Sequence, residues 1–88
     1  MCRSIRPLFN FQPPASDAEI RASALQFVRK VSGFTKPSHA NAEAFERAID
    51  EVADAARKLI LSLQSAAPPR DREIEARKAR ERSRLRFE

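Results

Sequence analysis

The sequence predicts an all-α fold: an antiparallel helical hairpin with an extended N-terminal arm and a basic C-terminal helix. A capping box begins one helical segment, apolar residues recur at helical spacings in a second, and prolines interrupt the chain before the first and after the second. Large apolar residues become sparse after Leu63. We therefore expect residues 1–67 to form the hairpin domain with its arm, and residues 68–88 to form a partly ordered basic helix.

Residues 1–16 are predicted to form the extended arm. Pro7, Pro13 and Pro14 prevent a continuous helix, because each lacks a backbone N–H and restricts the residue before it. The large apolar side chains of this segment still need burial. We expect them to pack on the helices, and they are Ile5, Leu8, Phe9 and Phe11.

The first helix is predicted over Asp17–Ser32. Ser16 and Glu19 have capping-box spacing, in which each side chain accepts a hydrogen bond from the backbone N–H of the other residue. Gly33, the only glycine, stands where a left-handed C-terminal cap is needed. The expected core ridge comprises Ile20, Ala24, Phe27 and Val31, and a second ridge for the arm comprises Leu25 and Val28.

The second helix is predicted over about His39–Ser65, with Ser38 or Asn41 as its cap. Its apolar residues have the heptad-like spacing of a helix packed lengthwise on another: Phe45, Ile49, Val52, Ala56, Leu59 and Leu63. About 25 residues make a helix roughly 37 Å long, against roughly 23 Å for the first. The overhang needs a partner, so the candidate self-association residues are Leu59, Ile60, Leu61 and Leu63.

A third, marginal helix is predicted to begin near Pro69, since proline is favoured at the first position of a helix. Glu73 and Glu81 are each spaced four residues from Arg77, which allows ion pairs along the helix. We expect this helix to fray beyond Arg82.

The net charge is +5 and is unevenly distributed. Residues 1–38 carry six bases and two acids, residues 39–69 three and five, and residues 70–88 eight and five. Basic ends therefore flank an acidic middle. This pattern favours an anionic partner, and it equally permits the basic tail to lie on the acidic segment of the same or a neighbouring chain.

Composition argues against several classes of protein. One cysteine, Cys2, and one histidine, His39, make an intramolecular disulfide or a zinc site from this chain improbable. No apolar run is long enough to span a bilayer, and no signal peptide is recognisable, so the expected compartment is the cytoplasm. We expect no cofactor, and no small-molecule substrate is evident.

Two groups of basic residues are candidate anion or nucleic-acid contacts. The first lies at the turn before the second helix, whose N-terminus could bind a phosphate or carboxylate, and comprises Arg29, Lys30, Lys36, Ser38 and His39. The alternative is a solvated turn whose cations complement the end of the first helix. The second group lies in the tail and comprises Arg77, Lys78, Arg80, Arg82 and Arg84. Interspersed acids also allow a solvated helix with internal ion pairs.

Two further functions are disfavoured. A helix-turn-helix DNA reader would place the second helix in the major groove, but that helix carries five acids, Glu43, Glu46, Asp50, Glu51 and Asp54. Cys2 would become an N-terminal nucleophile if Met1 were removed, but such enzymes need an oxyanion site and a large scaffold. We therefore expect no enzyme.

Three blocks, MCRSIRPLFNFQPPAS, LQFVRKVSGFTKPSHAN and PPRDREIEARKAR, resemble a family of small bacterial proteins classed as a domain of unknown function. With the second helix between them, they cover nearly the whole chain. The resemblance implies a bacterial cytosolic protein and supplies no activity or site residue.

The sequence thus predicts a non-enzymatic module that binds another protein or self-associates through the long helix. The alternative is a protein that associates with nucleic acid independently of sequence through the basic turn and the tail arginines. A tail folded on the acidic helix would support the first function, and a projecting basic tail the second.

Overall fold

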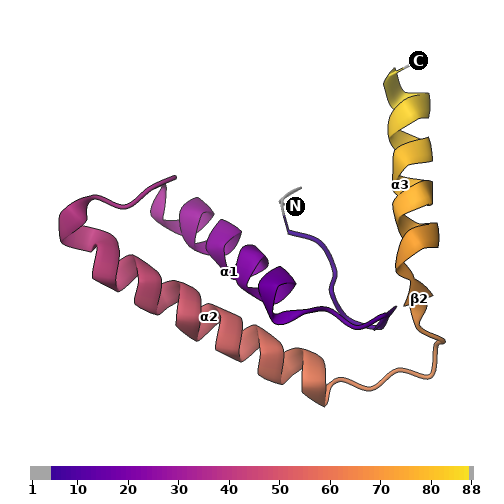
Figure 1. Cartoon of the computed structure of the whole chain (residues 1–88), viewed down its shortest axis with the longest axis horizontal. Helices are drawn as coiled ribbons and strands as arrows, with labels where there is room; N and C mark the ends of the chain where they lie inside the picture. The colour runs from indigo at the N-terminus through magenta and orange to yellow at the C-terminus, as the bar shows by residue number, and fades with distance from the viewer. Residues whose placement is uncertain (1–4, 88) are drawn as a thin grey trace.

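The computed structural model describes residues 5–87 and is mostly helical (Figure 1). Cys2, the residue weighed as a nucleophile, lies outside the described residues. The elements in chain order are β1 (Phe11–Gln12), α1 (Asp17–Ser32), the 3₁₀ turn η1 (His39–Asn41), α2 (Ala42–Ser62), β2 (Arg70–Asp71) and α3 (Arg72–Phe87). No helix within residues 5–87 combines the length and the apolar character needed to cross a membrane.

Helix α1 has the bounds that its local sequence predicts. The Ser16 side chain accepts from the backbone N–H of Glu19 at 3.2 Å, and Glu19 accepts from the N–H of Ser16 at 3.0 Å. At the other end Gly33 adopts φ 79°, and its N–H donates to the carbonyl of Arg29. Both predicted caps are confirmed, because each depends on residues within one turn of the helix.

The predicted core ridge of α1 is wrong in its second half. Ile20 and Ala24 are buried as expected, but the third buried residue is Val28. Phe27 is 46% exposed and Val31 is 71% exposed. The buried spacing is therefore four and four, which turns the packed face away from Phe27 as the helix proceeds.

Helix α2 is shorter than predicted. It is preceded by η1 and ends at Ser62 rather than Ser65, because Leu63 is already extended. Asn41 occupies the N-cap position, but its side chain makes no capping hydrogen bond and instead donates to the Ser38 hydroxyl at 2.9 Å. With 21 residues in α2 and 16 in α1, the lengths are about 31 Å and 24 Å.

The hydrophobic core lies between α1 and α2, which Figure 1 shows side by side. Its buried residues are Ile20, Ala24, Val28, Phe45, Ile49 and Ala53. Ala24 and Ala53 are the least bulky of these. Leu8 and Ala15 of the arm pack against this core, as do Leu25, Val52 and Ala56.

The arm also joins the C-terminal segment. Strands β1 and β2 pair in parallel, with Phe11 opposite Arg70 and Gln12 opposite Asp71. The prediction that Pro69 begins the third helix is therefore wrong: β2 intervenes, and the helix begins at Arg72, with the Asp71 carboxylate accepting from the N–H of Ile74 at 3.0 Å. Helix α3 continues to Phe87, beyond the predicted fraying point.

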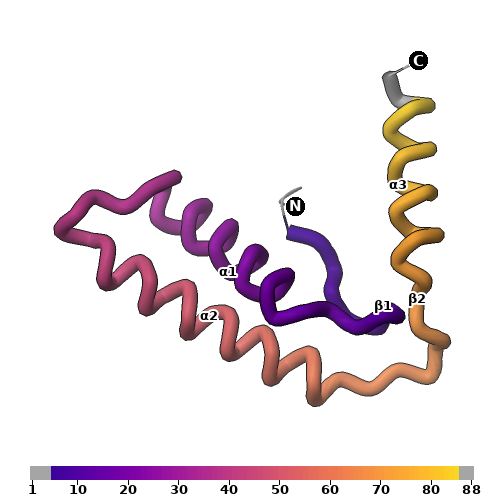
Figure 2. Tube along the Cα trace, viewed as in Figure 1, coloured from indigo at the N-terminus to yellow at the C-terminus, as the bar shows by residue number. Residues whose placement is uncertain are grey.

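Helix α3 projects away from the α1–α2 pair, as the Cα trace in Figure 2 shows. The molecule is correspondingly flat and open, with extents of 43 × 38 × 19 Å. The arm lies between α1 and α3 in this view.

Candidate functional site

The basic turn between α1 and α2 is partly occupied by its own hydrogen bonds. The Arg29 Nε donates to the Thr35 carbonyl at 3.0 Å, and the Ser38 hydroxyl accepts from Asn41. His39 begins η1. Arg29 therefore stabilises the turn through its hydrogen bond. Lys30 and Lys36 are the cations of the turn that are exposed to solvent.

The five basic residues of α3 that the sequence singles out are exposed but differ in their partners, and they are Arg77, Lys78, Arg80, Arg82 and Arg84. Lys78 Nζ lies 3.9 Å from Glu75, and Arg84 pairs with Glu81. Arg77 makes no ion pair with any residue in the described part of the chain, so the predicted pairs with Glu73 and Glu81 are wrong. Arg84 takes Glu81 instead.

The two basic groups are not brought together. The turn lies at one end of the α1–α2 pair, and α3 rises beyond the other end (Figure 1). A single compact ligand cannot contact both groups in this arrangement.

The residues predicted for self-association lie at the C-terminal end of α2 and just beyond it. Ile60 and Leu61 border a groove of about 460 Å³ whose other wall is the arm, including Leu8 and Phe9. Leu59 and Leu63 are among the exposed large apolar residues. Ile60 is half-buried and packs against the core, whereas Leu59, Leu61 and Leu63 are exposed.

Sequence reasoning missed the contact that places α3. We call it the arm–tail joint and define it by Asn10, Phe11, Glu19, Arg70 and Arg72. Asn10 has φ 65°, its carbonyl accepts from the Arg70 N–H at 2.8 Å, and its Nδ2 donates to two linker carbonyls at 3.3 Å each. The arm thus holds the start of the tail through backbone groups as well as side chains.

Two arginines of the joint converge on one aromatic ring. The guanidinium carbon of Arg70 lies 4.6 Å from the centroid of Phe11, and that of Arg72 lies 5.5 Å from it. Arg72 also donates from Nε to the Pro13 carbonyl at 2.6 Å and from Nη1 to Glu19 at 2.7 Å. These contacts lower the pKa of the Glu19 carboxyl, chiefly through the hydrogen bond from Arg72 and then through that from Ser16. The Pro-Pro-Arg-Asp-Arg run could have indicated an extended segment, but no local signal points to Glu19 as its partner.

A groove of about 640 Å³ opens beside this joint, between the arm and α3. Four arginines line it, Arg6, Arg70, Arg72 and Arg82. Two carboxylates, Glu19 and Glu75, border it as well. The groove therefore carries an excess of two positive charges.

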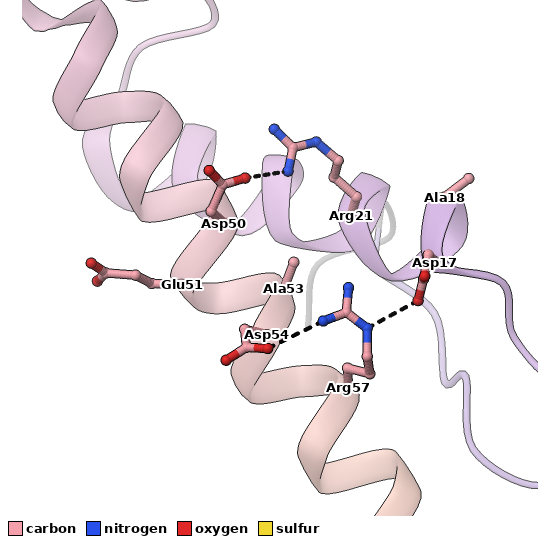
Figure 3. Close-up of a pocket in the computed structure, with 8 residues that line it drawn as sticks. All are labelled: Asp17, Ala18, Arg21, Asp50, Glu51, Ala53, Asp54 and Arg57. Atoms are coloured by element: carbon pink, nitrogen blue, oxygen red, sulfur yellow. Dashed lines mark hydrogen bonds and ion pairs between the residues drawn. The ribbon is translucent and has the colours of Figure 1, made fainter.

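A second charged groove, of about 560 Å³, lies across α1 and α2 (Figure 3). Here the charges neutralise one another. Arg21 pairs with Glu46 at 2.7 Å and with Asp50 at 2.5 Å, and its hydrogen bond to Asp50 raises its pKa. Arg57 bridges Asp17 at 2.9 Å and Asp54 at 3.2 Å. These pairs join the two helices and leave no surplus cation for a ligand.

Metal binding finds no support in the geometry of residues 5–87, where no three histidine, cysteine or carboxylate side chains form a suitable group. Comparison with curated proteins gives no match, and neither does comparison with solved structures. The family model described as an uncharacterized conserved protein, DUF2277, matches residues 1–78. This match includes α1, α2, the arm–tail joint and the first half of α3, so the chain belongs to the DUF2277 family.

Proposed function

We propose that the protein is a non-enzymatic interaction module, in which α1 and α2 form an antiparallel helical hairpin that self-associates through the end of α2. The observation that carries the proposal is a group of exposed leucines. Leu59 is 57% exposed, Leu61 is 79% exposed and Leu63 is 43% exposed. They lie within five residues of one another at the end of α2, and exposed apolar side chains favour association because their burial is favourable.

A second copy of this chain is the partner that the charges favour. One third of all residues are charged, yet residues 59–69 contain no charged side chain. Two copies can therefore bring these segments together without placing like charges in contact. A two-fold symmetric dimer needs such a surface, because the same patch faces itself across the axis.

Two charged groups with shifted pKa values, Glu19 and Arg21, serve as ion-pair partners within the fold. The pKa of Glu19 is lowered and that of Arg21 is raised, and both shifts favour the charge that each group ordinarily carries near neutral pH. General acids and bases need the opposite, a pKa moved toward the working pH. Both groups instead pair with neighbouring side chains and join parts of the fold.

Light scattering coupled to size exclusion tests self-association over a range of protein concentrations. We expect a mass that rises toward that of a dimer, and Leu61→Lys should keep the protein monomeric because it places a charge in the contact. Ala22→Lys is the matched control, since Ala22 is exposed on α1. A wild-type mass that stays monomeric at every concentration, or an equal effect of both variants, would contradict the proposal.

A second candidate function is sequence-independent association with nucleic acid. The projection of α3 away from the acidic α2 favours it, because the exposed Arg77 and Arg80 are then accessible to a phosphate backbone (Figure 1). Anisotropy titrations with labelled RNA and duplex DNA at two salt concentrations test it. We expect salt-sensitive binding, and Arg77→Ala with Arg80→Ala reports whether the outer face of α3 is the contact. No binding at low salt would rule it out.

A further inference from the structure

We propose that the groove between the arm and α3 is a binding site for a linear chain of phosphates, such as a single-stranded nucleic acid backbone or inorganic polyphosphate. This site is distinct from the outer face of α3 and from the leucines at the end of α2. It uses Arg6, Arg70 and Arg82. Of these, only Arg82 belongs to the basic groups that the sequence singles out.

The groove is built from three segments of the chain. Arg6 comes from the arm, Arg70 from β2, and Arg72 and Arg82 from α3. The arm and α3 are held in place by the β1–β2 pair and by the hydrogen bonds of Arg72. The segments that carry the four arginines are therefore held together by the fold, which reduces the ordering that a ligand must impose.

Its cations differ in how far they are already neutralised. Arg72 is occupied by Glu19 and the Pro13 carbonyl, and it serves to position the groove. Arg70 lies over Phe11, a contact that leaves its N–H donors available. Arg6 and Arg82 form no ion pair with the residues that the structure describes. Three guanidinium groups thus remain available for a bound anion.

The length of the site favours a chain of phosphates over a single one. The available Arg70 lies over the same Phe11 ring as Arg72, and Arg82 lies ten residues beyond Arg72 on α3, which corresponds to about 15 Å along the helix axis. Between them the groove is bordered by Ala76 and Ala79, whose small side chains leave room along the helix. A lone phosphate reaches one end of this distance, whereas two or more linked phosphates span it.

Arginine is suited to this ligand chemistry. Its planar guanidinium donates two parallel hydrogen bonds to a phosphate and keeps its charge at every relevant pH. A continuous polyanion also gains from the release of condensed counterions, so its binding weakens steeply as salt rises. An acidic peptide presents carboxylates without this high linear charge density, and the experiment below includes it as a competitor.

The test is a fluorescence-anisotropy titration of the full chain with a labelled oligothymidylate at low and high salt. The groove variant is Arg6→Ala with Arg82→Ala. The matched control is Arg77→Ala with Arg80→Ala, which removes the same charge from side chains that lie roughly 140–160° around α3 from Arg82. Circular dichroism verifies that both variants keep the helical content of the wild type.

We expect the groove variant to weaken binding about tenfold and the control less than about threefold. The salt dependence of the groove variant should fall by about 1.4 in log–log slope, the value for two lost contacts to a single strand. Inorganic polyphosphate should compete, whereas thymidine monophosphate and a polyglutamate peptide should not.

Three results would overturn the site: no binding at low salt, equal losses in both variants, or competition by polyglutamate as strong as that by polyphosphate. A loss confined to Arg77→Ala with Arg80→Ala would place nucleic acid on the outer face of α3 and refute the groove alone. Self-association is measured separately by light scattering. A monomeric mass would therefore contradict the proposed dimer without affecting the conclusion about phosphate binding.

Discussion

Glu19 accepts a hydrogen bond from Nη1 of Arg72 at 2.7 Å through one carboxylate oxygen and from the backbone N–H of Ser16 at 3.0 Å through the other. One side chain thus caps α1 and holds the first residue of α3, although the two partners lie at opposite ends of the sequence. The position of the tail is therefore coupled to the start of the helical pair.

Glu19→Gln should separate these two roles. Glutamine also serves in capping boxes, so the first turn of α1 should keep its protection while the charged contact with Arg72 is lost. We expect faster amide hydrogen exchange in β2 and in the first turn of α3, with a cost of about 0.5–1 kcal/mol for a partly exposed pair.

Glu19→Ala is the companion variant, since it removes the cap as well and should accelerate exchange in both helices. Mass spectrometry of exchanged peptides resolves the two regions. Unchanged protection of β2 in Glu19→Gln would show that Arg72 does not hold the tail through this carboxylate.

Acid should release the tail from the helical pair. The pKa of Glu19 lies below its ordinary value of 4.5, chiefly because Arg72 donates to the carboxylate. A lowered folded-state pKa adds stability that is present above pH 4.5 and is lost as the pH falls through the folded value. We expect the amide resonances of β2 to shift in that acidic range in NMR spectra. Because the Asp71 carboxylate of β2 is present in both proteins, the part of the shift that disappears in Glu19→Gln belongs to Glu19, and an unchanged shift there would assign the transition to another group.

Phe11 should stabilise the joint through its ring as well as its volume. Phe11→Leu keeps an apolar side chain but removes the aromatic face beneath Arg70. In a double-mutant cycle with Arg70→Ala, measured by urea denaturation, we expect a coupling energy of about 0.5–1 kcal/mol. Phe34→Leu with Arg70→Ala is the control cycle, because Phe34 lies in the loop after α1, and its effects should add independently. Additive effects in the Phe11 cycle would show that the cation–π contact does not stabilise the joint.

Features set by neighbouring residues could be predicted from the sequence, and features set by distant partners could not. The caps at Ser16 and Gly33 depend on atoms within one turn, so their spacing was sufficient. The exposure of Phe27 and Val31 depends on where α2 lies, which the periodicity of α1 alone leaves open. A helix with apolar residues on more than one side offers two ridges, and only the packed partner selects one.

The candidate site was only partly predictable for the same reason, because it depends on contacts between distant parts of the sequence. Arg77, Arg80 and Arg82 were visible as a basic run, but their division between the groove and the outer face depends on the orientation of α3. That orientation follows from Arg72, Glu19 and the β1–β2 pair, which join residues more than fifty positions apart. Pro69 suggested an earlier helix start, because helix propensity carries no information about a strand partner in the arm.

The core between α1 and α2 contains two buried small residues, Ala24 and Ala53. Ala24 is 2% exposed and Ala53 is 3% exposed, so neither position has room for a larger side chain. Ala53→Leu should force the helices apart and reduce the free energy of unfolding by about 1–3 kcal/mol. Ala55→Leu, on the exposed side of α2, should change it by less than about 0.5 kcal/mol. Thermal and urea denaturation measure both variants. An equal effect at the two positions would mean that the packed face of α2 does not include Ala53.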